Sequence, residues 1–313
     1  MNGDSRPPRG LSNSAGASGA GSAGSAVVGR VPAPLVFVVS AFSQYLGAGL
    51  AVSLFSLMPS TTVAWWRLVV GATVLMALRC PWRRSWTPKA MSLAAAFGTA
   101  TATMNVIFYA AISLLPLGTV VSLEFLGPVA VAAVTGRGWR PRCAAVLALL
   151  GVVSISGLGV DLGEPDQRTG VVLALAAGAA WAAYILLGRR VASAGAGIDS
   201  LAVGMVFGAL VYAPFAVGTA AGALTSVRSA AMALGVGLLS TAVPYGLEQA
   251  VLKRLGTDTF ALLSSLMPAT SMLVGVAVLG QLPSGWELTG LVLVSVAVAL
   301  ASADGRTPRP ASR

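Results

Sequence analysis

The chain has 313 residues, of which 56% are hydrophobic and only 10% are charged, and its mean hydropathy is +0.83. Soluble domains carry about 25% charged residues, so this composition excludes an ordinary water-soluble domain. The formal net charge is +10, but most basic residues lie in short segments between apolar runs, which favours membrane orientation over nucleic-acid binding.

In chain order, the sequence predicts a disordered cytoplasmic tail, ten membrane spans and a second short tail. Residues 1–30 are rich in glycine, serine and alanine and lack the apolar core of a signal peptide. Apolar runs then recur up to residue 303, each long enough to cross a hydrocarbon core of about 30 Å. Charged residues and proline or glycine breaks place the spans at about 34–57, 62–79, 90–112, 115–135, 143–160, 169–188, 200–220, 229–252, 257–280 and 286–303. Residues 304–313 form the second tail.

The basic residues orient these spans in the bilayer. With the N-terminus inside, 17 of the 20 lysines and arginines fall in cytoplasmic segments, whereas Arg168 and Arg228 fall outside. The remaining basic residue, Arg67, lies within the second span. This asymmetry predicts a multi-pass protein of a bacterial-type plasma (inner) membrane with both termini in the cytoplasm.

One short element occurs twice with opposite orientation. LGTVVSLEFLGP (117–128) and LGTDTFALLSSLMP (255–268) both place LGT at the start of a span and a proline near its middle. The loop before the first copy has no basic residue, whereas Lys253 and Arg254 precede the second. We therefore expect an all-α membrane protein with ten transmembrane helices in two inverted five-helix repeats, at 34–160 and 169–303. Such proteins bind their substrates near the midplane, between the repeats.

Glu124 is the acidic residue that lies deep in a predicted span, at about 13 Å for a rise of 1.5 Å per residue. An acid there costs on the order of 3 kcal/mol unless it is protonated or faces a polar cavity, which suits a site for protons or for a positive group. Pairing with a neighbouring helix is the structural alternative. Pro128 cannot donate to the carbonyl of Glu124, so a kink is expected to expose that carbonyl beside the carboxylate. Pro268 frees the carbonyl of Ser264 in the same way, unless these prolines serve packing alone.

Five further residues are candidates for the lining of this cavity. Asn105 and Tyr109 are four residues apart in the third span, so they share one helix face, at a depth similar to that of Glu124. Trp181 and Tyr184 lie in the middle of the sixth span, away from the interfaces that aromatic residues prefer, although core packing explains them equally well. Gln44 is a polar candidate in the first span.

Two other charged residues have alternative interpretations. Arg67 either extends to the outer surface as an anchor, or binds a carboxylate or gates the cavity from inside. Glu248 is predicted to lie at the cytoplasmic interface with Lys253 close by, so we do not expect it in the site.

Several segments resemble the drug/metabolite transporter superfamily. They are LPLGTVVSLEFLGPVAVAA (115–133), GAAWAAYILLGRR (178–190) and STAVPYGLE (240–248). Within that superfamily they are most similar to the EamA-type threonine and homoserine exporters, and the resemblance covers about residues 34–303. Many relatives have an acidic residue where this chain has Met267 and Gln281, so the second half has lost charge and Glu124 remains.

The resemblance implies a proton-coupled secondary transporter that exports a small zwitterionic metabolite such as threonine or homoserine across the lipid bilayer. Efflux of lipophilic cations is the alternative among transporters, and a non-transporting membrane scaffold or lipid-handling subunit is the alternative of another class. The sequence has no histidine, only two isolated cysteines, no phosphate-binding loop and no GxSxG motif. We therefore expect no enzymatic activity, no cofactor and no metal site. The oligomeric state is not predicted.

Overall fold

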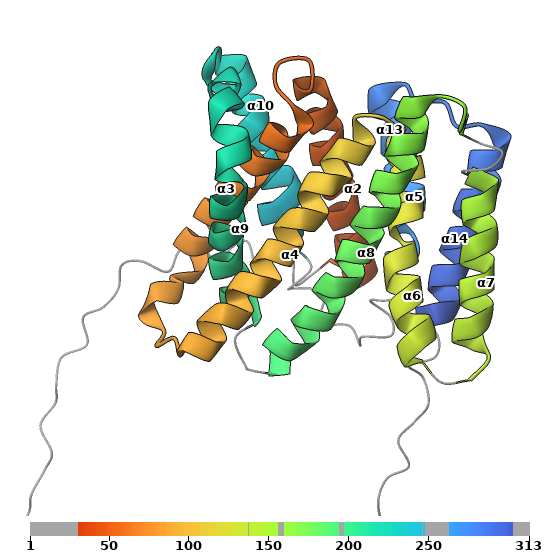
Figure 1. Cartoon of the computed structure of the whole chain (residues 1–313), viewed down its shortest axis with the longest axis horizontal. Coiled ribbons are helices and arrows are strands. Elements are labelled where there is room, and N and C mark those ends of the chain that lie inside the picture. Colours follow the sequence, from red (N-terminus) through yellow and green to blue (C-terminus); the bar gives the residue numbers. More distant parts are fainter. Residues whose placement is uncertain are drawn as a thin grey trace, which may run out of the picture.

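The computed structural model describes residues 31–136, 138–155, 160–193, 197–245, 247 and 263–302. Within these residues the regular secondary structure is entirely helical (Figure 1). Among the described residues, seven helices are long and apolar enough to cross a membrane, and shorter apolar helices accompany them. The expected all-α membrane protein is therefore confirmed.

Each of the ten expected spans contains helix. The helices are α2 (Ala33–Leu54), α3 (Ser60–Arg79), α4 (Pro88–Ile112), α5 (Leu117–Glu124), α6 (Leu126–Thr135), α7 (Arg140–Val153), α8 (Pro165–Ser193), α9 (Gly197–Ala220), α10 (Val227–Gly237), α13 (Met267–Leu279) and α14 (Gly285–Ser302). The fourth span is divided into α5 and α6, and α10 continues into a π-helical turn, Leu238–Ala242. The sixth helix begins earlier than predicted, and residues 156–159 of the fifth predicted span lie outside the described residues. The junction between the eighth and ninth spans, with Glu248 and Lys253, lies outside the described residues.

Local sequence signals explain several of the helix ends. The side chain of Thr87 accepts a hydrogen bond from the backbone N–H of Ala90 at 3.2 Å and so caps the start of α4. Ser226 and Ser229 form a reciprocal capping box at the start of α10. Gly280, whose φ is 65°, ends α13 in the left-handed conformation that glycine adopts without strain.

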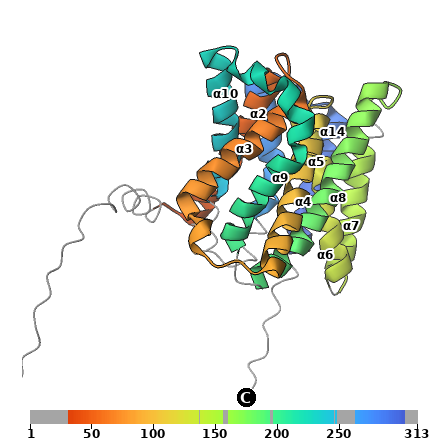
Figure 2. The same ribbon diagram turned by 60° about the vertical axis from the view of Figure 1, so that its left-hand side comes forward.

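The helices cross closely where glycines face one another. α4 packs against both α8 and α9, α3 packs against α9, and α7 packs against α14 (Figures 1 and 2). A Cβ on Gly98 of α4 would lie 1.9 Å from the carbonyl oxygen of Gly204 in α9, and a Cβ on Gly208 would meet Ala102. The GxxxG element at Gly204–Gly208 is thus a helix-packing element, and small residues there let the two backbones touch.

Both mid-span prolines lie just after an interruption of their helices. The helix breaks at Phe125 before Pro128 of α6, and at Ser265 and Leu266 before Pro268 of α13. A proline removes one i to i−4 hydrogen bond and clashes with that carbonyl, which accounts for both breaks. α5 and α13 pack against each other, so the two breaks lie in neighbouring helices at the centre of the bundle.

Candidate functional site

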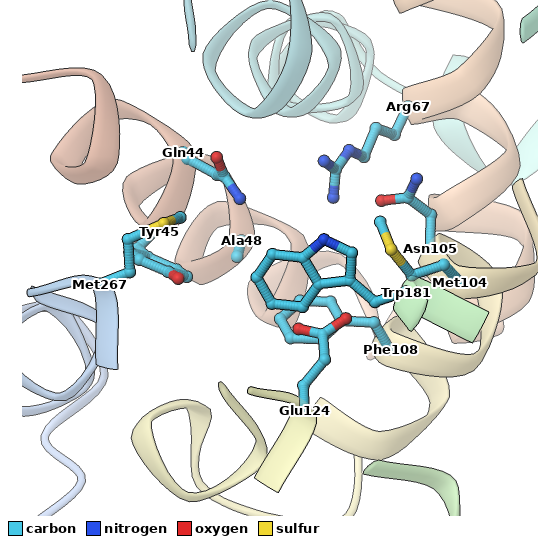
Figure 3. A pocket seen from close by; sticks show the side chains of 10 residues that line it. All are labelled: Gln44, Tyr45, Ala48, Arg67, Met104, Asn105, Phe108, Glu124, Trp181 and Met267. Atoms are coloured by element: carbon cyan, nitrogen blue, oxygen red, sulfur yellow. The ribbon is translucent and has the colours of Figure 1, made fainter. Parts of the chain in front are cut away.

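A cavity lies at the centre of the bundle, where the fourth span is broken (Figure 3). Its volume is about 50 Å³. Its lining combines aromatic and aliphatic groups with one acidic, one basic and two amide side chains. The lining residues are Gln44, Tyr45, Ala48, Arg67, Met104, Asn105, Phe108, Glu124, Trp181 and Met267.

A second, larger cavity of about 210 Å³ continues from the first. Both are lined by Gln44, Arg67, Met104, Trp181 and Met267. The second also reaches Phe37 near the start of α2 and Pro244 and Tyr245 just after the π turn, together with Tyr184, Ser240 and Ser264. These helix ends lie toward the same side of the bundle as the loop between α3 and α4 (Figure 1). The central cavity therefore extends toward the side that the charge distribution predicts to be cytoplasmic.

Glu124 occupies the last position of α5, immediately before the break, and its side chain is only 7% exposed. Its backbone carbonyl packs against α8, because a Cβ on Gly178 would lie 2.7 Å from that oxygen. The carboxylate itself lines the cavity beside Trp181, whose ring meets Phe125 edge-on at 4.7 Å between centroids. The break was expected to expose the carbonyl beside the carboxylate, but the close approach of α8 takes up the space next to the carbonyl.

Arg67 turns into the protein rather than outward. It is 8% exposed, and its Nε donates to the Thr241 hydroxyl at 3.2 Å while an Nη donates to the Ser240 carbonyl at 3.0 Å. Its guanidinium carbon lies 5.5 Å from the centre of the Tyr109 ring. These contacts exclude the surface-anchor interpretation. The π turn of α10 supplies both acceptors, and such turns are frequent at functional sites.

The residues predicted on α4 are close together but occupy different places. Asn105 lines the cavity, and its Nδ2 donates to the carbonyl of Thr101 at 2.7 Å. Tyr109 is fully buried below Arg67 and contacts the rings of Phe55 and Phe108. The Tyr109 ring thus supports the guanidinium from behind, outside the lining of the two cavities.

The other predicted residues divide between lining and support. Gln44, Trp181, Tyr184 and Ser264 line one or both cavities. The Tyr184 ring also stacks on Phe97 at 4.8 Å between centroids. Pro128 and Pro268 belong to the first turns of α6 and α13, where they shape the breaks that position Glu124 and Met267.

Sequence reasoning missed several residues around the site. Ser240 and Thr241, which hold Arg67, begin the STAVPYGLE segment but were not assigned to the cavity. Met104 and Phe108 carry no sequence signal that distinguishes them from core residues. Met267 was noted only for the acid that it replaces.

A second buried glutamate, Glu287, also escaped the sequence analysis, although Ser284 and Glu287 have the spacing of a capping box. One Glu287 carboxylate oxygen accepts from the backbone N–H of Ser284 at 2.8 Å, and the other accepts from the Thr119 hydroxyl. Nearby, the side-chain oxygen of Gln281 accepts from the backbone N–H of Leu117 at 3.0 Å. These bonds join the turn between α13 and α14 to the first turn of α5, at the end of the bundle opposite the loop between α3 and α4 (Figure 1).

The comparisons with known proteins agree with this architecture. Residues 168–303 match the EamA-like transporter family. The threonine/homoserine exporter RhtA of Salmonella typhimurium (strain LT2) is 38% identical over 273 residues, which are 87% of this chain and 90% of that protein. The protein of the same name from Escherichia coli (strain K12) is 38% identical over 275 residues, which are 88% and 91% of the two chains. The chain belongs to the EamA-like transporter family.

Membership in this family makes the chain a transporter rather than an enzyme. Its apolar helices and its bacterial relatives make it a multi-pass protein of the inner membrane. One solved crystal structure, 18% identical, matches with a TM-score of 0.53 over 85% of this chain and 96% of the other. That match supports the fold alone.

Proposed function

We propose that this EamA-like transporter exports threonine, homoserine or a similar small zwitterionic amino acid in exchange for protons. The observation that carries the proposal is a central cavity with one buried cation, Arg67, and one buried acid, Glu124, in its lining. The relatives named as threonine/homoserine exporters, at 38% identity over most of both chains, support this substrate class.

The two charged residues match the two charges of an amino acid. A guanidinium has five N–H donors, and the bonds of Arg67 to Ser240 and Thr241 leave further donors for the substrate carboxylate. In Figure 3 the guanidinium points into the cavity, with Glu124 on the other side of the Trp181 ring. Glu124 then accepts the ammonium group of the substrate.

Proton coupling follows if Glu124 can hold either a proton or an ammonium group, but not both. When the cavity faces outward, a proton displaces the amino acid from the carboxylate. When the cavity faces inward, the proton leaves and the next substrate binds. A buried carboxylate without either partner is costly, so the transporter rarely changes its direction of opening with Glu124 empty and charged. Export of the amino acid is therefore linked to entry of the proton.

Helix packing supports the proposal of two inverted halves. If α2 to α7 correspond in order to α8, α9, α10, α13 and α14, with α5 and α6 as one span, then several contacts between the halves have counterparts. α4 packs on α8 as α10 packs on α2, and α5 packs on α8 as α13 packs on α2. α3 with α9 and α7 with α14 are pairs of equivalent helices. This pattern fits a two-fold axis in the membrane plane through the cavity.

The proposed orientation has both termini in the cytoplasm and Asp161–Gln167 outside, because of the basic residues described above. Single cysteines at Glu164 and at Arg140, in a background lacking Cys80 and Cys143, test it. An impermeant maleimide on intact cells should label position 164 but not position 140. The reverse pattern would invert the topology.

Efflux from cells preloaded with a panel of amino acids tests the substrate. Overproduction should speed the loss of threonine and homoserine and raise tolerance to both. Faster loss only of a lipophilic cation such as ethidium would support the drug-efflux alternative, for which a lone buried acid also suffices. No acceleration for any solute, at verified membrane abundance, would favour the scaffold alternative, although a scaffold has no need of a charged cavity.

A further inference from the structure

The amide of Asn105 has a fixed orientation. Its Nδ2 lies 2.7 Å from the carbonyl oxygen of Thr101, one helical turn earlier in α4. A carbonyl can only accept a hydrogen bond, so the NH₂ group of the amide must face it. The Oδ1 of Asn105 therefore occupies the opposite branch, and in Figure 3 it points toward the interior of the cavity, on the side of Arg67 and Trp181.

This oxygen is an acceptor without a donor. Asn105 is 4% exposed, and in the part of the chain that the structure describes its Oδ1 receives no hydrogen bond. An oxygen in this position can bind an O–H or N–H group of a bound solute but not a carboxylate, which has no proton to donate.

Threonine and homoserine carry three polar groups, and Arg67, Glu124 and Asn105 supply a complementary group for each, beside a second amide, Gln44, in the same lining. Arg67 can only donate and takes the carboxylate, while Glu124 takes the ammonium group. The remaining group of both amino acids is a hydroxyl. We propose that Asn105 is a specificity-determining residue whose Oδ1 accepts the hydrogen bond of the substrate hydroxyl. This inference depends on the function proposed above.

The consequence is discrimination against amino acids that lack a hydroxyl. Such a solute displaces water from the Asn105 oxygen but donates no hydrogen bond to it. A buried acceptor left unpaired in this way is more costly than a missing contact. Sites that bind a hydroxyl reject its deoxy analogue for this reason. Removal of the hydroxyl from threonine or from homoserine gives the same compound, 2-aminobutanoate. A single probe therefore tests both substrates.

The experiment measures export of threonine, homoserine and 2-aminobutanoate from the same preloaded cells. The two ratios compared are the export rates of threonine and of homoserine, each divided by that of 2-aminobutanoate, and they are independent of expression level. We expect the wild type to favour the hydroxylated substrates by about 10-fold or more, because a hydrogen bond to a neutral buried partner changes binding by about that factor. Asn105→Leu should reduce both ratios to near 1. Glu164→Gln, at an exposed loop position outside the cavities, should leave them unchanged.

Asn105→Thr is the conservative variant. Thr101 and Thr103 of the same helix donate their hydroxyls to the carbonyls of Phe97 and Thr99 at 2.8 Å. A threonine at 105 can donate to the carbonyl of Thr101 in the same way and keep its oxygen as an acceptor, so it should restore part of the discrimination. A purely structural role for Asn105 would change all three rates together and leave the ratios constant.

The outcomes separate this inference from the function on which it rests. Ratios near 1 in the wild type, or ratios that Asn105→Leu leaves unchanged, would overturn the role of Asn105 while threonine export itself stands. Failure of the wild type to export either hydroxylated amino acid would overturn the proposed function, and the inference with it.

Discussion

Glu124 and Glu287 are equally buried, each 7% exposed, but their surroundings differ. Glu287 accepts hydrogen bonds from Ser284 and from Thr119, so both of its carboxylate oxygens are occupied by neighbouring protein groups. The carboxylate of Glu124 lines a cavity, and Arg67 is the charged residue that interacts with it electrostatically.

The difference shows that burial alone does not identify a transport residue. A carboxylate whose acceptors are all filled by the protein stabilises the fold, as at the capping box of α14. One with acceptors directed into a cavity is available to a proton or to a cationic group. Substitutions that remove only the charge separate the two roles.

Glu124→Gln should have the largest effect. Glutamine keeps the shape of the side chain but can neither bind a proton reversibly nor pair with an ammonium group. Because a hydrogen bond to a charged group contributes about 1.5–3 kcal/mol, gradient-driven threonine export should fall about 100-fold at unchanged membrane abundance. The measurement is efflux of labelled threonine, with Glu164→Gln, at an exposed loop position, as the matched control. Export by Glu124→Gln equal to that of the control would make Glu124 structural.

Arg67→Gln should have the second-largest effect on transport. Loss of the guanidinium removes the partner of the substrate carboxylate, so the KM for threonine should rise about 10- to 100-fold. Arg67→Lys keeps the charge but not the planar array of donors that reaches both Ser240 and Thr241, so it should be intermediate. Threonine uptake by inverted membrane vesicles, measured over a range of concentrations, gives the KM and the maximal rate of each variant. A lower maximal rate with an unchanged KM would assign Arg67 to gating.

An acid on the opposite wall should partly replace Glu124. Met267 lines both cavities from the start of α13. The double variant with Glu124→Gln and Met267→Glu should recover about 10% of export, because a carboxylate again faces the cavity but from a different direction. The comparison is with Glu124→Gln alone and with a double variant carrying Met267→Gln. Equal rates in all three would show that the position of the acid is fixed at residue 124.

Glu287→Gln should have the smallest effect on transport. The amide oxygen can still accept from Ser284, so threonine export should stay within about 2-fold of the wild type, with a loss of stability of about 1 kcal/mol from the weakened cap. Thermal unfolding in detergent alongside efflux measures both effects. A collapse of export at normal stability would move Glu287 from the cap to the transport mechanism.

Much of the fold could be predicted from the sequence because the bilayer imposes simple rules. Apolar runs and charge breaks located all ten spans, and Pro128 and Pro268 located the two helix breaks, since a proline must disturb the preceding turn. The start of the sixth span was misplaced because α8 extends beyond the apolar run into the preceding loop. Residues such as Asp166 in the first turn of α8 are polar but helical.

The candidate site was predicted only in part. Glu124 and Arg67 were identifiable because a charge in a span has few explanations. Sequence could not show that Arg67 turns inward, because its direction depends on acceptors in the π turn more than 170 residues later. Likewise, Tyr109 shares a helix face with Asn105, but it is fully buried against the guanidinium of Arg67 and is not part of the cavity lining.

Proton movement in reconstituted vesicles tests the exchange at Glu124 most directly. Purified protein in proteoliposomes with a pH-sensitive dye inside should move protons when a threonine gradient is imposed, in the direction opposite to the amino acid. Glu124→Gln should abolish this signal, while Glu124→Asp keeps a fraction of it and Glu287→Gln keeps most of it. A threonine-driven proton signal of wild-type size in Glu124→Gln would contradict the account and require another coupling site.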